Sequence, residues 1–209
     1  MKLCSPIAGI ILSAGASSRM GTPKALLQFQ GETFLDRLIR LFSAAGVAPI
    51  VALGHHAEQI RAGIERGADA TFVLNPDPER GMLSSLQCAL AAIPEQIEAA
   101  MFMPVDHPNL EAETLRQLIA RFNGDQPPVT VPTFQDKHGH PVLISRAPIA
   151  ELLALPPTAQ ASDVIHCYRS ETAYIAVDDP AVIADVDDPT TYAALLAHNP
   201  PPTSHPPRP

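Results

Sequence analysis

The sequence predicts an α/β fold with three layers (α/β/α), in which helices cover both faces of a mostly parallel sheet. Two observations support this fold class. Short apolar runs alternate along the chain with longer segments of helical periodicity, which is the pattern of parallel sheets. Apolar residues also make up 46% of the 209 residues and charged residues only 17%. The chain can therefore bury a hydrophobic core and is not a disordered protein.

The strands are expected where apolar or β-branched residues follow one another. Ile7–Leu12 and Ile50–Leu53 contain no polar side chain, which is typical of strands that are buried on both faces. Five further strands are expected at Thr71–Leu74, Ala100–Val105, Val129–Thr133, Val142–Ile144 and Ala173–Val177.

Helices are expected between these strands, and several have recognisable ends. Thr33 can cap the first helix with Asp36 three residues later, and Gly46 can end it. Asn123-Gly124 is expected to end the fourth helix, and Asp188-Pro189 to start the last. The expected helices lie near Phe34–Ala45, Glu58–Arg66, Met82–Ile93, Glu113–Phe122 and Thr190–Ala197.

The domain organisation is expected to be simple. Residues 1–198 should form one domain, and residues 199–209, with the sequence NPPPTSHPPRP, should form a disordered tail. Proline can continue neither a helix nor a strand ladder, and this segment has no large apolar side chain to bury.

Charge and cysteine content exclude several classes of function. The 22 acidic and 14 basic residues give a net charge of −8, whereas a sequence-independent nucleic-acid binder needs excess positive charge. The three distant cysteines form no CxxC pair, which argues against disulfides and structural zinc. No apolar run reaches the ~20 residues that span a bilayer. The N-terminal segment resembles a secretory signal only weakly. We expect a cytoplasmic protein with neither nucleic-acid nor membrane partners.

The loop after the first strand carries the clearest sign of function. From Ser13 to Lys24 it combines small residues and glycines with two cations, Arg19 and Lys24. Small residues let backbone N–H groups point at an anion, and the cations suit a polyphosphate. The loop contains neither G-x-x-x-x-G-K-[ST] nor G-x-G-x-x-G, which disfavours P-loop kinases and dinucleotide-dependent dehydrogenases. Taken alone, it also fits a small-residue turn with solvated cations.

Three aspartates are candidate metal ligands. Asp106 follows an expected strand, and side chains at the carboxyl ends of parallel strands point into the ligand crevice. Its carboxylate could hold Mg²⁺ or could cap the helix that follows. Asp185 and Asp187 are two residues apart and can face the same side in an extended segment. Either can supply a second ligand, or both can be solvated neighbours of a helix cap.

Two further clusters have a structural alternative. Gly81, Ser84 and Ser85 lie at an expected helix start, where hydroxyl and N–H groups could contact a base or ribose, or where a serine could cap the helix. His138 and His140 form an H-x-H pair that could chelate zinc, but no third ligand follows at a suitable spacing.

These segments together resemble the molybdenum-cofactor nucleotidylyltransferase family, the MobA-like NTP transferases. The segment from Leu12 to Gly31 reads L-S-A-G-A-S-S-R-M-G-T-P-K-A-L-L-Q-F-Q-G and is similar to the family signature. The resemblance extends to about residue 197. Its other motifs are Asn75-Pro76, Gly81–Leu86, Pro104–Pro108, Gly139–Val142 and Asp185–Pro189.

The resemblance implies a fold, a reaction and a set of site residues. The fold would be Rossmann-like, as in nucleotide-diphospho-sugar transferases. The reaction would be Mg²⁺-dependent transfer of CMP from CTP to molybdopterin with release of pyrophosphate. The implied catalytic residues are Lys24, Arg19 and Asp106, and the implied metal ligands are Asp106, Asp185 and Asp187. The acceptor would contact Gly139 and His140. The nucleotide would contact Leu12, Ala14, Gly15, Arg19, Lys24, Asn75, Gly81, Ser84 and Ser85.

Several alternatives remain open at this point. Ala14-Gly15 stands where the family's guanylyltransferases usually carry Gly-Gly, which favours CTP over GTP. A GTP-using enzyme, or a transferase for another phosphorylated metabolite, is the alternative within the class. A different class is a non-catalytic nucleotide- or cofactor-binding chaperone or regulator, against which the presence of Asp106 argues. The resemblance also implies transient contact with a molybdoenzyme or its chaperone.

Overall fold

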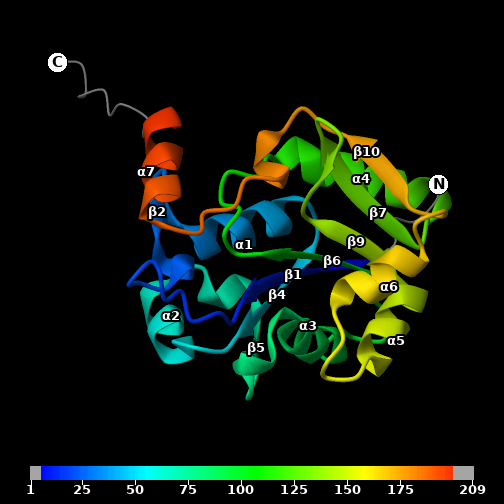
Figure 1. Ribbon diagram of the computed structural model, residues 1–209, viewed down its shortest axis with the longest axis horizontal. Helices are drawn as coiled ribbons and strands as arrows, with labels where there is room; N and C mark the ends of the chain where they lie inside the picture. The colour runs from blue at the N-terminus through cyan, green and yellow to red at the C-terminus, as the bar shows by residue number, and fades with distance from the viewer. Residues whose placement is uncertain (1–5, 200–209) are drawn as a thin grey trace.

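An eight-stranded sheet forms the middle layer of the computed structural model, which describes residues 6–199 (Figure 1). Its strand order is β10-β7-β9-β6-β1-β4-β5, and β8 pairs with β7. The strands are β1 (Ile7–Ser13), β4 (Ala48–Leu53), β5 (Thr71–Leu74), β6 (Ala99–Pro104), β7 (Val129–Phe134), β8 (Lys137–His138), β9 (Val142–Ser145) and β10 (Ala173–Ala176). Only β8 and β9 pair antiparallel with their neighbours in this sheet. The predicted fold class is confirmed.

Helices cover both faces of the sheet and complete the three layers (Figure 1). One face carries α1, α2 and α4, and the other carries α3, α5 and α6. The helices are α1 (Phe34–Ala44), α2 (Ala57–Gly63), α3 (Met82–Ala91), α4 (Ala112–Asp125), α5 (Arg146–Ala154), α6 (Ala161–Cys167) and α7 (Pro189–His198). A small hairpin of β2 (Gln28–Phe29) and β3 (Glu32–Thr33) precedes α1.

The central strand β1 shows why this sequence forms a sheet that is buried on both faces. All of its seven residues are buried. Ile7 and Ile11 belong to the core on the α1 face, while Ile10 and Leu12 belong to the core on the α3 face. The alternation follows the two-residue period of a strand. Gly9 faces the α1 side, where a Cβ atom would overlap the ring of Phe42.

The predicted ends of α1 and α7 are confirmed. Thr33 accepts a hydrogen bond from Asp36 N and caps α1, and Gly46 follows its end with φ = 74°. Asp188 accepts from the Thr190 and Thr191 amides and caps α7, with Pro189 in the first turn. These caps satisfy backbone N–H groups that a helix start leaves unpaired.

Two predicted helix ends were wrong. The fourth helix does not end at Asn123-Gly124 but continues to Asp125, because Gln126 takes the left-handed conformation (φ = 50°) and its N–H bonds to Phe122 O. The second helix ends at Gly63, before the expected Arg66. The Asp36 carboxylate accepts hydrogen bonds from the Glu65 and Arg66 amides at 2.8–3.2 Å, so these amides do not continue the helix.

Helices α5 and α6 were not predicted. Pro148 is the third residue of α5, a first-turn position where proline costs no hydrogen bond. Helix α6 has only seven residues, which is too short for a clear periodic pattern. The tail expected at 199–209 lies outside the described residues except for Asn199. Between residues 6 and 199, no helix has the length and apolar character needed to cross a membrane.

Candidate active site

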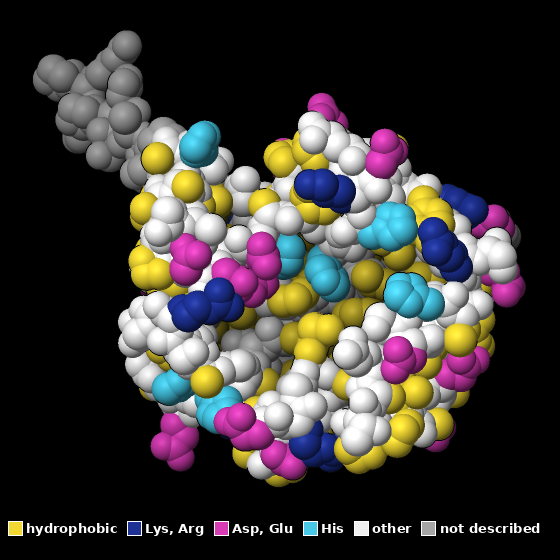
Figure 2. All heavy atoms as spheres, viewed as in Figure 1, with side chains coloured by type: hydrophobic (Ala, Val, Ile, Leu, Met, Phe, Trp, Pro, Cys, Tyr) yellow, Lys and Arg dark blue, Asp and Glu magenta, His cyan; other side chains and the backbone are white. Residues whose placement is uncertain are grey.

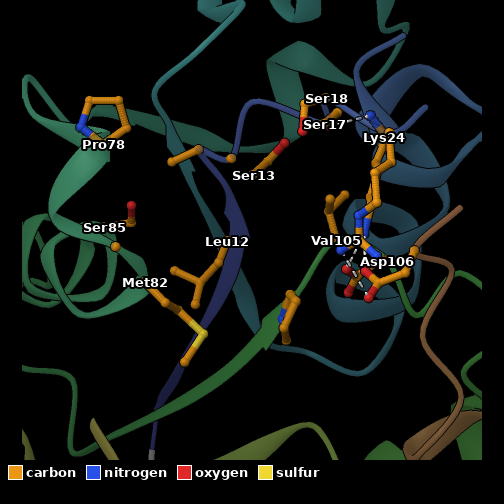
Figure 3. A pocket seen from close by; sticks show the side chains of 16 residues that line it. Leu12, Ser13, Ser17, Ser18, Lys24, Pro78, Met82, Ser85, Val105 and Asp106 are labelled. Carbon is orange, nitrogen blue, oxygen red and sulfur yellow. Dashed lines mark hydrogen bonds and ion pairs between the residues drawn. The ribbon is translucent and has the colours of Figure 1, made fainter. Parts of the chain in front are cut away.

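A cavity of about 320 Å³, called the first cavity here, opens at the carboxyl ends of β1 and β6 (Figure 3). Its wall comes from the loop after β1, the start of α3, the residues that follow β6 and the segment before α7. The predicted site residues that line it are Leu12, Ala14, Gly15, Arg19, Lys24, Gly81, Ser85, Asp106 and Asp187. The sheet therefore brings together residues from four distant segments of the chain.

The loop after β1 is held in place by contacts of its own backbone. Ser17 has a positive φ of 50°, and its hydroxyl accepts a hydrogen bond from Lys24 N at 3.1 Å. The Ala14 carbonyl accepts from His55 N at 3.1 Å, and Ala14 packs so closely on Gly54 that a Cβ there would lie 2.8 Å from the Ala14 oxygen. The small residues therefore let the loop turn tightly beside β4.

Lys24 connects two carboxylates at the edge of the first cavity. Its Nζ donates to Asp106 Oδ2 at 2.8 Å and to Asp187 Oδ1 at 2.6 Å, and Arg19 Nη2 lies 3.4 Å from Asp187 Oδ2 (Figure 3). Burial disfavours the ammonium, but the hydrogen bonds and charges of both aspartates outweigh it and raise the pKa of Lys24. The same contact with Lys24 lowers the pKa of Asp187. Lys24 and Asp187 are therefore charged at neutral pH.

The donor set fits a divalent cation that takes oxygen ligands. Asp106 Oδ1 is buried and has no hydrogen-bond partner among residues 6–199, and a buried carboxylate oxygen without a donor is costly. The described part of the chain has no cluster of three or more His, Cys, Asp or Glu side chains that could hold a metal, so this pair of carboxylates is not part of a larger cluster of that kind. Mg²⁺ commonly takes one or two carboxylates and completes its shell with water and phosphate oxygens. Asp106 and Asp187 match that pattern.

Asp185 does not share the first cavity with Asp187. The expected common orientation of the two side chains requires an extended strand from Asp185 to Asp187. The structure has no strand in this segment. The Val186 N–H donates to Asp106 O at 2.9 Å and the Val186 side chain is buried. Asp187 therefore lines the first cavity, while Asp185 lines a neighbouring one and is exposed.

Asn75 and Ser84 were expected to contact the nucleotide, but the structure places both outside the first cavity. They are 3% and 4% exposed. Asn75 Nδ2 donates to Ser84 Oγ at 2.8 Å and to Ser85 Oγ at 2.9 Å, while the Ser84 hydroxyl donates to Gly81 O at 2.8 Å. The two side chains therefore hold the start of α3 and so position Gly81 and Ser85 at the cavity wall.

A second cavity of about 370 Å³ adjoins the first and shares Pro104 and Asp106 with it. The predicted acceptor residues Gly139 and His140 lie here. A Cβ on Gly139 would overlap the backbone of Val182, and His140 N donates to Val182 O at 2.8 Å. A glycine is thus required for the turn to pack on this segment.

His140 is a neutral histidine inside the second cavity. Burial, together with the neighbouring His107, lowers its pKa from 6.5 to about 4. Its Nδ1 atom is buried and has no hydrogen-bond partner within residues 6–199. The His138 ring stacks on Tyr174, and within residues 6–199 no group of three or more His, Cys, Asp or Glu side chains could form a zinc site with it.

Some residues at the site were missed from the sequence. Met82 directly follows Gly81 and is 48% exposed, and with Leu12 it gives the first cavity an apolar side (Figure 3). His107 lines the second cavity, and its buried ring contacts Ala181 O through Nδ1 at 2.9 Å. The one signal for Met82 in the sequence is that it is an apolar residue at the start of an expected helix. The other lining residues not predicted are Ser13, Ser17, Ser18, Pro78, Pro104 and Val105.

The site and the fold together define a class of protein. A loop of small residues, two cations and a carboxylate pair surround a cavity at the carboxyl ends of parallel strands, which is where α/β proteins bind nucleotides. Residues 9–173 match the family model of the MobA-like NTP transferase domain. The chain belongs to this family and is a nucleotidyltransferase.

Full-length relatives support this membership. A molybdenum cofactor cytidylyltransferase of Escherichia coli K12 is 24% identical over 188 residues, which cover 90% of this chain and 94% of the relative. A molybdenum cofactor guanylyltransferase of Xanthomonas euvesicatoria is 27% identical over 205 residues, covering 96% of this chain and 100% of the relative. The two relatives thus use different nucleotides by name.

Solved structures agree with the fold. The crystal structure of Rv0371c from Mycobacterium tuberculosis H37Rv superposes with a TM-score of 0.81 and 30% sequence identity, covering 93% of this chain and 100% of that one. A structure of Rv0371c in complex with manganese has a TM-score of 0.77 and 29% identity, covering 92% and 99% of the two chains.

Proposed function

We propose that this protein transfers CMP from CTP to molybdopterin and releases pyrophosphate, with Mg²⁺ as its metal. The observation that carries the proposal is the contact of Lys24 with Asp106 and Asp187 at the edge of a cavity of about 320 Å³. Relatives named as molybdenum cofactor nucleotidyltransferases support the acceptor. The manganese complex of Rv0371c supports a divalent metal.

The reaction needs positioning and charge neutralisation more than proton transfer. An oxygen of the acceptor phosphate attacks the α-phosphorus of CTP, a new P–O bond forms, and the bond to the pyrophosphate leaving group breaks. The attacking oxygen is already an anion, so no general base is required. When bound, the divalent cation neutralises charge on the phosphate oxygens. Asp106 and Asp187 would hold it.

Lys24 and Arg19 neutralise the remaining charge. Both side chains line the first cavity and contact Asp187. Each can therefore replace its contact with the Asp187 carboxylate by a contact with a phosphate oxygen of the nucleotide. The backbone N–H groups of the loop after β1 can point at the triphosphate, as in other anion-binding loops. Such donors act most strongly where charge develops in the transition state.

The choice of CTP rests on Ala14. Ala14 lines the first cavity at the position where the guanylyltransferases of the family usually carry glycine, and its Cβ atom packs against Gly54. Ala14 is only 6% exposed, so its neighbours hold it in place and it cannot easily shift to admit a larger base. A glycine would leave more room for a purine in this position.

The proposal can be tested by supplying the purified protein with Mg²⁺, molybdopterin and each of CTP, GTP, ATP and UTP in turn. Pyrophosphate release should be fastest with CTP and should require molybdopterin. Faster release with GTP would make this a guanylyltransferase. Nucleotide binding without any pyrophosphate would indicate a binding protein and would contradict the proposed activity.

A further inference from the structure

A third cavity of about 430 Å³ lies between α6 and the β7, β9 and β10 end of the sheet. We propose that it is a subsite for the far end of the acceptor, and that it takes a planar heterocycle with hydrogen-bond-accepting or anionic groups. The residues that would bind this group are His138, His166, Arg169 and Tyr174. The proposal deepens the proposed function, on which it rests for the position of the acceptor phosphate.

The third cavity is connected to the catalytic centre through shared walls. His138, Gly139 and His140 line both the second and the third cavity, and Asp106 lines both the second and the first. The third cavity therefore adjoins the second, and the second adjoins the first. Figure 2 shows this face of the molecule hollowed, with several histidine side chains around the hollow. An acceptor with its phosphate near Asp106 can extend into the third cavity.

The charge of the third cavity differs from that of the protein as a whole. The chain has 22 acidic and 14 basic residues, yet no acidic residue lines this cavity, which instead contains one arginine and three histidines. The other two cavities contain aspartates. With one guanidinium, Arg169, and no carboxylate among its lining residues, the third cavity is suited to an anionic or hydrogen-bond-accepting group, not to a cation.

Arg169 is available to such a ligand. Its guanidinium makes no hydrogen bond or ion pair with any residue between 6 and 199, whereas Arg40, for example, pairs with Glu32 at 2.8 Å. Arg169 belongs to the turn that follows α6, and its N–H bonds to His166 O at 3.2 Å, which fixes the backbone. A guanidinium has five donors and no acceptor, so it favours carbonyl or anionic oxygen atoms of a ligand.

Two aromatic rings line the third cavity together with Arg169. The rings of His138 and Tyr174 stack at a centroid distance of 4.7 Å and an interplanar angle of 22°. Tyr174 is 42% exposed and lies opposite Val131 in the parallel register of β10 and β7, so the sheet holds its backbone firmly. Exposed aromatic faces of this kind stack on planar rings. Arginine donors in the same cavity select a heterocycle that carries acceptor groups.

The subsite should affect binding of the acceptor and leave the reacting groups unchanged. Arg169→Ala and Tyr174→Ala should each raise the KM for molybdopterin by about tenfold or more, as expected for the loss of a charge-assisted hydrogen bond or a stacking surface. The KM for CTP should stay within about twofold. Tyr174→Phe keeps the ring and should behave like the wild type. Arg116→Ala, on the exposed side of α4, is the matched control.

A binding measurement separates this proposal from the proposed function. The probe is 6-carboxypterin, a fluorescent planar heterocycle with a carboxylate, titrated with the wild type and the four variants. We expect 6-carboxypterin to bind the wild type, Tyr174→Phe and Arg116→Ala with similar affinity. We expect about tenfold weaker binding by Arg169→Ala and Tyr174→Ala. This result supports the subsite even if no nucleotide yields pyrophosphate. Equal binding by all proteins, or no binding by the wild type, would overturn it. Turnover with an unchanged molybdopterin KM in both alanine variants would overturn the subsite and leave the transferase activity standing.

Discussion

Lys24 Nζ lies 2.8 Å from Asp106 Oδ2, although 82 positions separate the two residues in the chain. The contact joins the loop after β1 to the residues that follow β6. Both side chains are largely shielded, with exposures of 14% and 16%. The lysine therefore neutralises the carboxylate, and a cation that binds Asp106 competes with the Lys24 ammonium.

Replacing Lys24 by alanine should separate two effects. Removal of one preorganised cationic contact typically costs ~10²–10³ in rate, so Lys24→Ala should lose turnover by about that factor. The same variant should bind Mn²⁺ more tightly than the wild type in the absence of nucleotide, because Asp106 and Asp187 lose their competing ammonium. Steady-state kinetics and calorimetric titration measure the two effects. Arg121→Ala, on α4, is the control; weaker Mn²⁺ binding by Lys24→Ala would contradict the competition.

Asp187 and Asp185 should differ as metal ligands. Asp187 contacts Lys24 and Arg19 in the first cavity, while Asp185 lies in the second. Asp187→Asn should therefore need several times more Mg²⁺ for half-maximal rate, and Asp185→Asn should follow the wild-type curve. The same Mg²⁺ dependence in the two variants would remove Asp187 from the metal site.

Asn75 should contribute to stability and not directly to nucleotide binding. Asn75→Ala leaves the buried Ser84 and Ser85 hydroxyls without their donor, and such a loss costs about 1–3 kcal/mol. Urea unfolding should show this decrease, whereas Gln59→Ala, at an exposed position of α2, should change little. An unchanged free energy of unfolding combined with a strongly raised KM for CTP would instead indicate a direct contact with the nucleotide.

His140 should make the fold less stable in mild acid. Its pKa is about 6.5 when the chain is unfolded and about 4 in the fold, so between these values the unfolded chain binds more protons. Stability therefore falls as the pH drops below 6.5 and stops falling below about 4. Between pH 7 and pH 5 the histidine should account for about 2 kcal/mol. Urea unfolding at both pH values should show a smaller difference for His140→Gln; an equal difference would exclude His140 as the source.

Features fixed by neighbouring residues could be predicted from the sequence. The strand β1 follows from a run of apolar residues, and the start of α1 from Thr33 and Asp36, because a helix cap uses atoms only three residues apart. The loop from Ser13 to Lys24 could be identified as a candidate anion-binding loop for the same reason, since its small residues and its two cations lie in one segment. Asp106 was placed correctly because strand ends in parallel sheets converge on one crevice.

Features that depend on distant contacts could not be predicted. The end of α2 depends on Asp36, which takes the amides of Glu65 and Arg66 from another part of the chain. Asn75 is a predicted nucleotide contact, but in the structure it is buried outside the first cavity, where its side chain donates to Ser84 and Ser85. In both cases the deciding hydrogen bond is formed by the tertiary structure, which a local pattern does not describe.

The most direct test of a metal-dependent transferase centred on Asp106 is the rate of pyrophosphate release by Asp106→Asn as a function of Mg²⁺. Asparagine has nearly the same shape but no charge, so the fold should melt at nearly the wild-type temperature and CTP should still bind through Arg19, Lys24 and the loop amides. The rate should fall by about 10²-fold or more at every Mg²⁺ concentration. An Asp106→Asn protein that releases pyrophosphate at the wild-type rate, with the wild-type Mg²⁺ dependence, would contradict the role of this carboxylate and the mechanism built on it.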